Sequence, residues 1–579
     1  MRLDPSMQRS LGELDAVDLI VVGSGAAGLT AALTAILEGL TVIVLEISSK
    51  FGGTTARSSG TVWIPDNQLM RAAGLAPDRQ AAKAYLSDIV NGHARPEQWS
   101  AYLDEAPKMQ ADLEARAGIA FRPFMKAPDY RSSLKGAALG GRALEPMAFD
   151  GRLLGNWFDK LAEPMRELTV LGGMMLTRGE AQRLIHAERS ASAILEGLRL
   201  VSRHLRDRVR FKRGTRLVMG NALVARLLHG VLTRGGSAFT DVHIDRLHFK
   251  EDRVSGVSGV HLGRAFTLDA RAGVVLAGGG FPANEEMRAR YLPALTPCHT
   301  PASPFANGST INLGVSAGGH IGPDAGSNAM WFPSSLWPRK DGGVAVYPHI
   351  ALDRAKPGSI IVDQNGERFA NEAASYHDFC CAMFDHGATA VPAYMIAGRD
   401  FIRRYGLGVI RPRTPSLKAY LSAGYLRHGD NPDALARTLG LPQGSLGRSI
   451  DRFNAFAKSG HDADFKRGDS AYERSNGDED RGFKNPCLGP VATDALYAVA
   501  LWPTPLATAR GLLCNETGNV LGDDGRPLPG LYAAGNDMQS VFGGQYPGAG
   551  AQIGPAMTFA WTAARHAASH MRKHHGRTG

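Results

Sequence analysis

Cysteine is scarce in this chain, with 5 among 579 residues. None of the five forms a C-x-x-C pair or a C-x-x-C-H sequence, which excludes zinc sites of that spacing and c-type haem attachment. Their odd number argues against a disulfide framework and predicts a reducing compartment. His299, His349 and His377 are not spaced as a metal-ligand set, so we predict no metal site.

Long apolar runs are also missing. No stretch of ~20 uncharged apolar residues occurs, so we expect no integral membrane segment. The first residues, Met1–Pro5, lack a basic start followed by an apolar core, so we expect no secretory leader. Together with the few cysteines, these absences predict a cytoplasmic protein.

Acidic residues are fewer than basic ones, 55 Asp and Glu against 65 Lys and Arg, which gives a formal net charge of +10. Much of the excess gathers in one basic run: Arg199, Arg203, Arg206, Arg208, Arg210, Lys212, Arg213 and Arg216. The run has no regular aromatic interleaving and no nucleic-acid motif, so we expect a solvated basic face and no nucleic-acid partner. Loose association with a membrane surface is the alternative interpretation.

A glycine-rich loop near the N-terminus predicts a dinucleotide site. The apolar strand Val17–Val22 is followed by Gly23-Ser24-Gly25-Ala26-Ala27-Gly28 and by an Ala/Leu-rich helix that runs to about Glu38. The next strand, Thr41–Leu45, ends in Glu46, close to the ~20-residue spacing typical of a ribose-binding carboxylate. In this arrangement the pyrophosphate lies at the helix N-terminus.

The segments that follow favour FAD over NAD. Phe51-Gly52-Gly53-Thr54-Thr55-Ala56-Arg57-Ser58-Ser59-Gly60 is a loop of small residues that can pass close to a flat ring system. A second apolar strand, Gly273–Phe281, ends in glycines and resembles the strand that returns to the nucleotide domain in two-domain flavoproteins.

A second glycine-rich loop lies near the C-terminus, between a strand at Gly530–Ala534 and a helix from about Ile553. It contains Gln545-Tyr546-Pro547-Gly548-Ala549-Gly550. We expect the Tyr546 phenol and the Gly550 backbone amide of this loop to lie where a flavoenzyme binds its substrate.

Motifs over nearly the whole chain are similar to those of the FAD-dependent fumarate reductase and succinate dehydrogenase flavoprotein-like family, within which the 3-ketosteroid Δ1-dehydrogenases fit best. They are GSGAAG, GGTTARSSGTVWIP, GGRALEP, PGSIIVDQNGERFANEAASY, FKRGDSAYERSNGD, NPCLGP, GLYAAGN and QYPGAG. The resemblance implies a two-domain α/β flavoprotein. A Rossmann-like FAD-binding domain would comprise residues 1–331 and 504–579, with an inserted α+β catalytic domain at 332–503.

Three positions favour the steroid branch. Fumarate reductases carry an Arg at the place of Tyr376, and a His and an Arg at the places of Phe542 and Tyr546. A phenol cannot replace the bidentate charge of Arg, so a dicarboxylate substrate is disfavoured. Two tyrosines and a phenylalanine predict a neutral, largely apolar ketone.

The resemblance also implies a mechanism. The Tyr546 hydroxyl and the Gly550 amide would donate to the 3-keto oxygen, as an oxyanion hole does. Tyr376 would remove the proton from carbon 2, and hydride from carbon 1 would go to flavin N5, which gives a 1,2 double bond. A phenol of pKa near ~10 is a poor base at neutral pH and needs help. Tyr130 is the candidate helper, although the RSSLKGAAL segment that follows it departs from the family pattern.

The cofactor would be FAD, held without a covalent bond. Its expected contacts are Gly23, Gly25, Ala26, Ala27, Gly28, Glu46, Gly52, Gly53, Thr54, Thr55, Ser59, Gly60, Ala277, Gly278, Gly279, Gly535, Asn536 and Ile553. The reduced flavin would pass electrons to a quinone, another redox protein or oxygen.

Other elements are expected from local patterns. Helices are predicted at about 81–91, 97–117, 191–206, 432–439 and 446–458, β segments at about 238–262, and a polar surface stretch at 461–484.

Two alternatives to a steroid Δ1-dehydrogenase remain open from the sequence. One is a dehydrogenase for another cyclic ketone or another steroid ring position, such as Δ4, with a fumarate reductase-like enzyme less favoured. The other is a non-catalytic protein that keeps the dinucleotide fold, because fold does not fix function.

Overall fold

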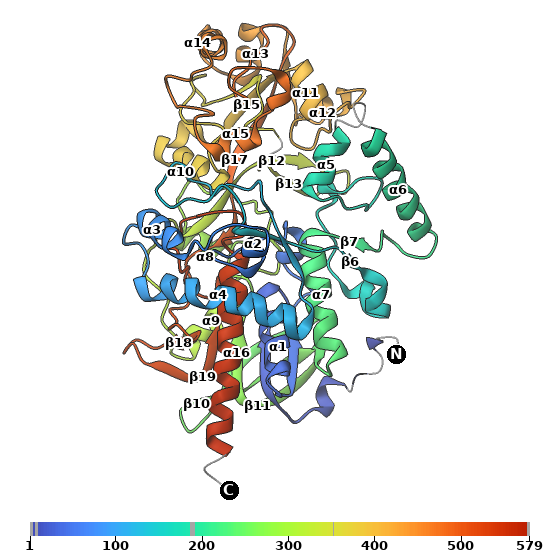
Figure 1. Ribbon diagram of the computed structural model, residues 1–579, viewed down its shortest axis with the longest axis vertical. Helices are drawn as coiled ribbons and strands as arrows, with labels where there is room; N and C mark the ends of the chain where they lie inside the picture. The colour runs from blue at the N-terminus through green and yellow to red at the C-terminus, as the bar shows by residue number, and fades with distance from the viewer. Residues whose placement is uncertain (1–3, 6–7, 9, 186–190, 351–352, 576–579) are drawn as a thin grey trace.

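Two large sheets organise the fold, one in each half of the long axis (Figure 1). The computed structural model describes residues 4–5, 8, 10–185, 191–350 and 353–575. The α/β class predicted from the sequence is confirmed. The domain boundaries at 331/332 and 503/504 stay predictions.

The lower sheet in Figure 1 is mainly parallel at its centre, with strand order β18-β19-β11-β1-β2-β8. Its strands are β1 (Ala16–Val22), β2 (Val42–Leu45), β8 (Ser237–Phe239), β9 (Val242–Lys250), β10 (Arg253–His261), β11 (Arg264–Leu276), β18 (Asn519–Leu521) and β19 (Pro527–Ala533). β1 pairs in parallel with β2 and β11, and β11 with β19, so their carboxyl ends meet at one edge. Ligands bind at that edge in open α/β sheets.

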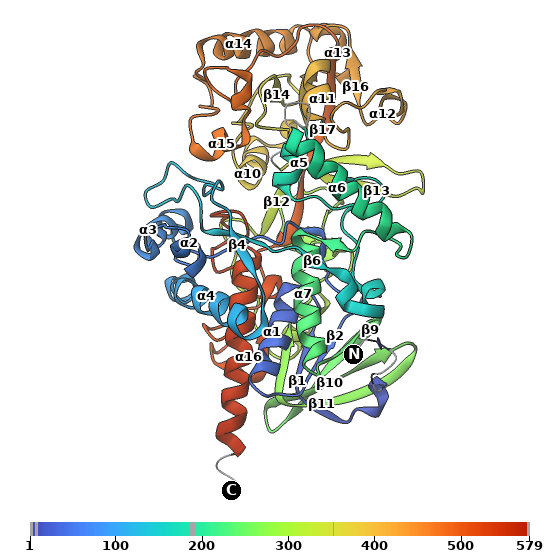
Figure 2. The ribbon, with the colours of Figure 1, turned by 45° about the vertical axis from the view of Figure 1, so that its right-hand side comes forward.

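The helix after β1 is enclosed on all sides. This helix, α1 (Ala26–Leu37), is buried from Ala26 through Ala35. It packs against α7 (Met219–Thr233) and α16 (Ile553–His575), and Figure 2 shows the three side by side. A helix that is apolar all round is stable only when it is buried in this way.

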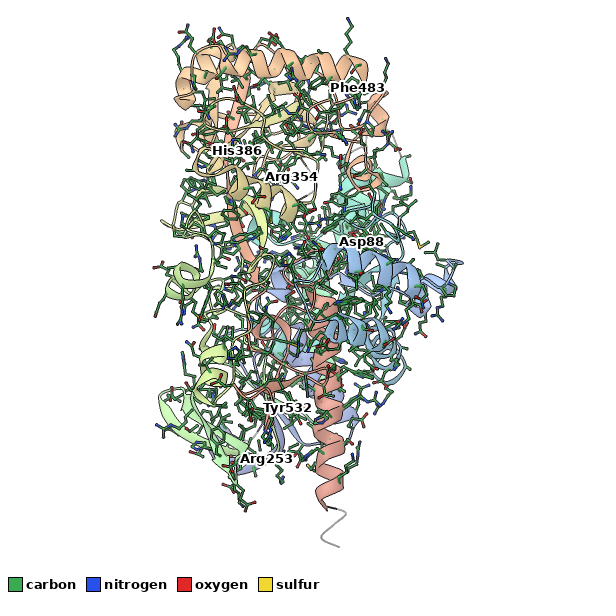
Figure 3. All side chains as sticks on the ribbon, turned by 90° about the vertical axis from the view of Figure 1, so that its left-hand side faces the viewer. Asp88, Arg253, Arg354, His386, Phe483 and Tyr532 are labelled. Atoms are coloured by element: carbon green, nitrogen blue, oxygen red, sulfur yellow. The ribbon has the colours of Figure 1, made fainter. Side chains whose placement is uncertain are left out.

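The upper sheet takes its strands from a later part of the chain, in the order β13-β12-β17-β15-β14, with β16 paired to β17. These are β12 (Ala329–Pro338), β13 (Val344–Pro348), β14 (Ser359–Val362), β15 (Ala393–Gly398), β16 (Arg427–Gly429) and β17 (Leu496–Thr508). Figure 3 shows Arg354 and His386 in this half and Tyr532 and Arg253 in the other.

The remaining helices and small strands cover and connect the two sheets. They are α2 (Gln68–Ala72), α3 (Arg79–Val90), α4 (Pro96–Ala117), α5 (Arg178–Ile185), α6 (Ala191–Arg208), α8 (Glu285–Tyr291), α9 (Ser309–Ser316), α10 (Tyr376–His386), α11 (Arg399–Tyr405), α12 (Lys418–Ser422), α13 (Pro432–Leu439), α14 (Ser445–Ser459) and α15 (Ala471–Asn476), with β3 (Val62–Trp63), β4 (Phe121–Pro123), β5 (Ala143–Pro146), β6 (Phe149–Asp150) and β7 (Arg216–Leu217). The five helices predicted from local patterns are confirmed as α3, α4, α6, α13 and α14.

The strand predicted at Gly273–Phe281 is shifted. The strand begins earlier, at Arg264, and ends at Leu276. The amides of Gly278 and Gly280 donate to the Asp537 carboxylate, at 2.6 Å and 2.8 Å, instead of to a neighbouring strand. A turn therefore replaces the last part of the expected strand.

The predictions of a solvated basic face and of a polar surface stretch at 461–484 are partly wrong. Arg213 is buried and donates to Asn221 Oδ1 at 3.0 Å, and Arg216 pairs with Glu180 at 2.5 Å. Asp462 and Arg467 are each 0% exposed. Buried charges of this kind need partners in space, which a chain pattern does not reveal.

Candidate active site

A cavity of about 670 Å³ lies where the loops of the two sheets meet. Most of the predicted site residues line it: Gly23, Gly25, Ala26, Ala27, Glu46, Gly53, Thr54, Thr55, Ser59, Ala277, Gly278, Gly279, Gly535, Asn536 and Ile553, with Tyr130, Tyr376, Tyr546 and Gly550. Residues from distant parts of the chain thus share one chamber, as expected for a cofactor and a substrate that react together.

The first glycine loop lines the cavity at the start of α1. Gly25 is the N-cap of α1 and has no side chain to cap the helix, while the Ala26 amide donates to Thr55 Oγ1 at 3.0 Å. A Cβ at Gly53 would meet no atom within 4 Å, so this glycine faces open space. Uncapped amides at a helix start favour an anion.

Glu46 is held in place by the loop that it follows. Its carboxylate accepts from the amide and the hydroxyl of Ser24, at 3.0 Å and 2.5 Å, and from the Ser48 amide at 3.0 Å. Burial raises the pKa of Glu46, and these hydrogen bonds oppose that rise. The side chain is therefore fixed at the end of β2, as a ribose-binding carboxylate must be.

Three predicted cofactor residues lie behind the cavity wall. A Cβ at Gly28 would overlap the Gly23 carbonyl, and one at Gly60 would overlap the backbone of Gly220. The Gly52 amide donates to Ser24 Oγ at 2.9 Å. Gly28, Gly52 and Gly60 therefore allow close backbone packing and do not line the cavity.

Two phenols meet in the cavity from opposite halves of the molecule. The hydroxyls of Tyr130 and Tyr376 lie 2.7 Å apart, within hydrogen-bond distance, and either can donate. The Tyr546 ring stacks on Tyr130 with centroids 5.5 Å apart and meets Tyr376 edge-on at 5.3 Å. Burial raises the pKa of Tyr376 and Tyr130 well above 10 and that of Tyr546 to about 12. All three are neutral at physiological pH.

The Gly550 amide is the second polar group beside Tyr546. In the described part of the chain it donates to no protein acceptor, whereas the Gly550 carbonyl accepts from the Trp63 amide at 3.2 Å. Its φ of 95° favours glycine, and a Cβ there would overlap the Thr61 carbonyl. The geometry leaves one N–H for a ligand.

A buried arginine fixes the Tyr130 loop. Arg142 donates to Asp129 at 2.6 Å and to Asp78 at 2.6 Å, and Trp63 Nε1 donates to Asp129 at 2.8 Å. The Tyr130 amide donates to the Pro547 carbonyl at 3.0 Å, which ties this loop to the Tyr546 loop. Removal of one partner of such a pair leaves a buried charge uncompensated.

A second buried arginine fixes the segment before Tyr376. Arg354 donates to the Glu372 carbonyl at 2.7 Å and to the Ala374 carbonyl at 3.2 Å. The Glu372 carboxylate is bound by Arg368, which also binds Asp462 at 2.7 Å. The backbone that precedes Tyr376, the first residue of α10, is therefore held in place.

Sequence reasoning missed part of the wall. The segment from Pro164 to Ala181 supplies Met165, Leu168, Val170, Met175, Leu176 and Arg178, and Phe332 lies against Tyr376 at 4.2 Å. The segment contains no motif that could have identified it. Asp537, which accepts from the Gly278 amide, could have been identified, because it directly follows Gly535 and Asn536 in the GLYAAGN motif. Phe542, expected to shape the substrate site, packs on Trp63 and Tyr102 and does not line the cavity.

The lining fits FAD. An uncapped helix start, a fixed carboxylate at the end of β2 and glycines open to the chamber are the groups that hold a dinucleotide. The protein also matches the FAD binding domain family over residues 18–553. The chain belongs to this family. Its members share an FAD-binding flavoprotein fold, and this protein is an FAD-dependent oxidoreductase.

Relatives of this flavoprotein have several substrates. It is 35% identical to the 3-oxosteroid 1-dehydrogenase of Mycobacterium tuberculosis strain H37Rv, over 96% of this chain and 99% of that one. It is 33% identical to the 4-oxocyclohex-2-ene-1-carboxylate 5-dehydrogenase of Sinomonas cyclohexanicum, over 95% and 93%. The solved 3-ketosteroid Δ1-dehydrogenase of Sterolibacterium denitrificans, in complex with 1,4-androstadiene-3,17-dione, superposes with a TM-score of 0.89 at 34% identity, over 96% of this chain and 100% of that one.

Two further features of the flavoprotein concern metals and membranes. In the part of the chain that the structure describes, no group of three or more His, Cys, Asp or Glu side chains is placed to hold a metal ion. Every helix within the described ranges is too short or too polar to span a bilayer.

The Glu46 contacts yield a prediction for cofactor binding. Glu46→Gln replaces one acceptor oxygen by an NH₂ group that faces the amides of Ser24 or Ser48, which are also donors. We expect the Kd for FAD to rise at least ~10-fold, because a buried hydrogen bond is lost. Titration of the apoprotein with FAD measures it. Glu38→Gln, at the surface end of α1, is the control, and an unchanged Kd for Glu46→Gln would contradict the assignment.

Proposed function

We propose that this enzyme introduces a 1,2 double bond into the A ring of 3-ketosteroids. The observation that carries the proposal is the Tyr130–Tyr376 hydroxyl contact beside the open Gly550 amide. Relatives named 3-oxosteroid 1-dehydrogenase support it. The residues fall into a carbonyl-binding pair and a proton-accepting pair.

The carbonyl-binding pair is Tyr546 and Gly550. With its pKa raised to about 12, the Tyr546 hydroxyl keeps its proton and remains a donor across the physiological range. Together with the Gly550 N–H it would hold the 3-keto oxygen and stabilise negative charge that develops on it. The protons on the adjacent carbon 2 become more acidic as a result.

The proton-accepting pair is Tyr376 and Tyr130. Tyr376, neutral in most molecules, would react through the small fraction that is ionised, and this phenolate would take the carbon 2 proton. Tyr130 would donate a hydrogen bond to the phenolate oxygen. The two oxygens lie 2.7 Å apart, an ordinary O–H···O distance. Hydrogen bonds to charged groups are about twice as strong as neutral ones, so this contact would stabilise the phenolate. FAD, when bound, supplies the acceptor for hydride from carbon 1.

The cavity wall favours an apolar ring system. Met165, Leu168, Met175 and Phe332 line it, and no arginine stands at the positions of Tyr376 or Tyr546. A dicarboxylate would lose its hydration beside Tyr376 and Tyr546 without a bidentate partner at either position.

A monocyclic ketone with one carboxylate is the second candidate. Two relatives from Sinomonas cyclohexanicum are named for 4-oxocyclohexene- and 4-oxocyclohexanecarboxylate. The Arg178 side chain lines the cavity and donates to Asn476 at 2.6 Å. Among the arginines that line the cavity, Arg57, Arg122 and Arg178, we take Arg178 as the candidate to bind a substrate carboxylate.

An anaerobic assay tests the function. The holoenzyme is mixed with 4-androstene-3,17-dione or with 4-oxocyclohexanecarboxylate, and flavin absorbance and product mass are followed. We expect rapid bleaching and a 1,2-dehydro product with the steroid. Bleaching by the carboxylate alone would transfer the function to the second candidate, and bleaching by neither would contradict both.

Tyr376→Phe tests the proton acceptor. We expect FAD content and steroid affinity to be kept and the rate of flavin reduction to fall at least ~100-fold, the lower end of general-base contributions. Tyr472→Phe is the matched control, since Tyr472 is buried 4.8 Å from the Tyr130 ring but does not line the cavity. Near-normal reduction in Tyr376→Phe would remove Tyr376 from this role.

The raised pKa of Tyr376 predicts the pH dependence. Below that pKa the phenolate fraction grows ~10-fold for each pH unit. The rate constant of flavin reduction, measured by stopped flow at saturating steroid, should therefore climb through pH 7 to 10 without a plateau. The residual rate of Tyr376→Phe should be flat over the same range. A plateau near neutrality in the wild type would contradict the phenolate mechanism.

A further inference from the structure

Helix α6 presents its apolar side to solvent. Ile194, Leu195, Leu198 and Leu205, with Val209 directly after the helix, are 49%, 68%, 63%, 60% and 84% exposed, and we call them the α6 stripe. Helical spacing places Ile194, Leu198 and Leu205 on one face. Large apolar residues gathered in this way on an exposed helix mark an interaction surface.

The opposite side of α6 is attached by polar groups. His204 and Asp207 are buried, and Asp207 accepts from the amide and hydroxyl of Thr215 at 2.8 Å and 2.9 Å. The His204 ring bonds to the Leu171 carbonyl at 2.9 Å. These contacts fix the helix with its leucines outward, so the exposure does not come from a loosely attached helix.

Cations surround the stripe. Arg199, Arg206, Arg208, Arg210 and Lys212 are all exposed. Of the two acidic residues on the helix, Asp207 is buried, and Glu196 is partly exposed but pairs with Arg183 at 2.7 Å. The surface around the stripe is therefore positive.

This charge selects among the surfaces that could cover the stripe. A second copy of the chain would bring two sets of these cations together, at an electrostatic cost. An anionic lipid bilayer would pair with the cations and accept the leucines below its headgroups, which is how amphipathic helices bind at membrane interfaces.

The helix that carries the stripe follows a segment of the chain that lines the cavity. The wall residue Val170 precedes α5, and the wall residues Arg178 and Ala181 lie on α5, the helix before α6. Leu171, which holds His204, follows Val170 directly. Figure 1 shows α5 and α6 together at the right-hand edge of the molecule.

We propose that the α6 stripe docks this enzyme on the anionic surface of a lipid bilayer, with the cavity held beside the membrane. An apolar ketone dissolved in the bilayer would then reach the cavity from the lipid phase. The docking itself does not depend on the identity of the substrate.

Vesicle sedimentation tests the docking. The holoenzyme is spun with vesicles of phosphatidylcholine alone or with phosphatidylglycerol added. We expect binding to the anionic vesicles, weakened by high salt. In Leu198→Gln/Leu205→Gln the partition coefficient should fall about 10-fold for each leucine, as expected when a leucine is no longer buried.

Matched controls make the result decisive. Leu139→Gln/Leu262→Gln changes two leucines that are 65% and 73% exposed elsewhere, and it should bind as the wild type does. Bound FAD and Tm check that each variant is folded. Equal binding of both double variants, no preference for anionic vesicles, or a lipid-free dimer that Leu198→Gln/Leu205→Gln dissociates would overturn the proposal.

Discussion

Two buried arginines fix the candidate active site, one on each side of the contact between Tyr130 and Tyr376. Arg142 fixes the loop of the first phenol through Asp129, and Arg354 fixes the backbone before the second. The phenols are 246 positions apart in the chain, yet their oxygens lie 2.7 Å apart. The positions of both phenols therefore depend on buried arginines that do not line the cavity.

Local motifs predicted the nucleotide-binding half well. The strand, glycine loop, helix and Glu46 follow from residues that are neighbours in the chain, and the structure places them at the carboxyl edge of the sheet. Gly28, Gly52 and Gly60 were assigned to the cofactor because a motif cannot tell a glycine that faces a ligand from one that faces backbone. Their roles became visible only when the atoms opposite each glycine were known.

The substrate half was less open to prediction, for physical reasons. The wall around Met165 and Met175 is made by side-chain packing from a segment without periodicity or motif. The 461–484 stretch has a polar composition, but Asp462 and Arg467 are buried because their partners come from another segment. The sequence shows charge, and only the fold shows whether that charge is neutralised.

The ion cluster of Arg368, Glu372, Asp462 and Arg467 has an evolutionary consequence. A single substitution there leaves a buried charge without its partner, so changes are tolerated only in compensating sets. The apolar wall is under no such restriction, because one hydrophobic side chain replaces another at small cost when volume is kept. The wall around Leu168 and Met175 can therefore change its shape by single substitutions, whereas the ion cluster cannot.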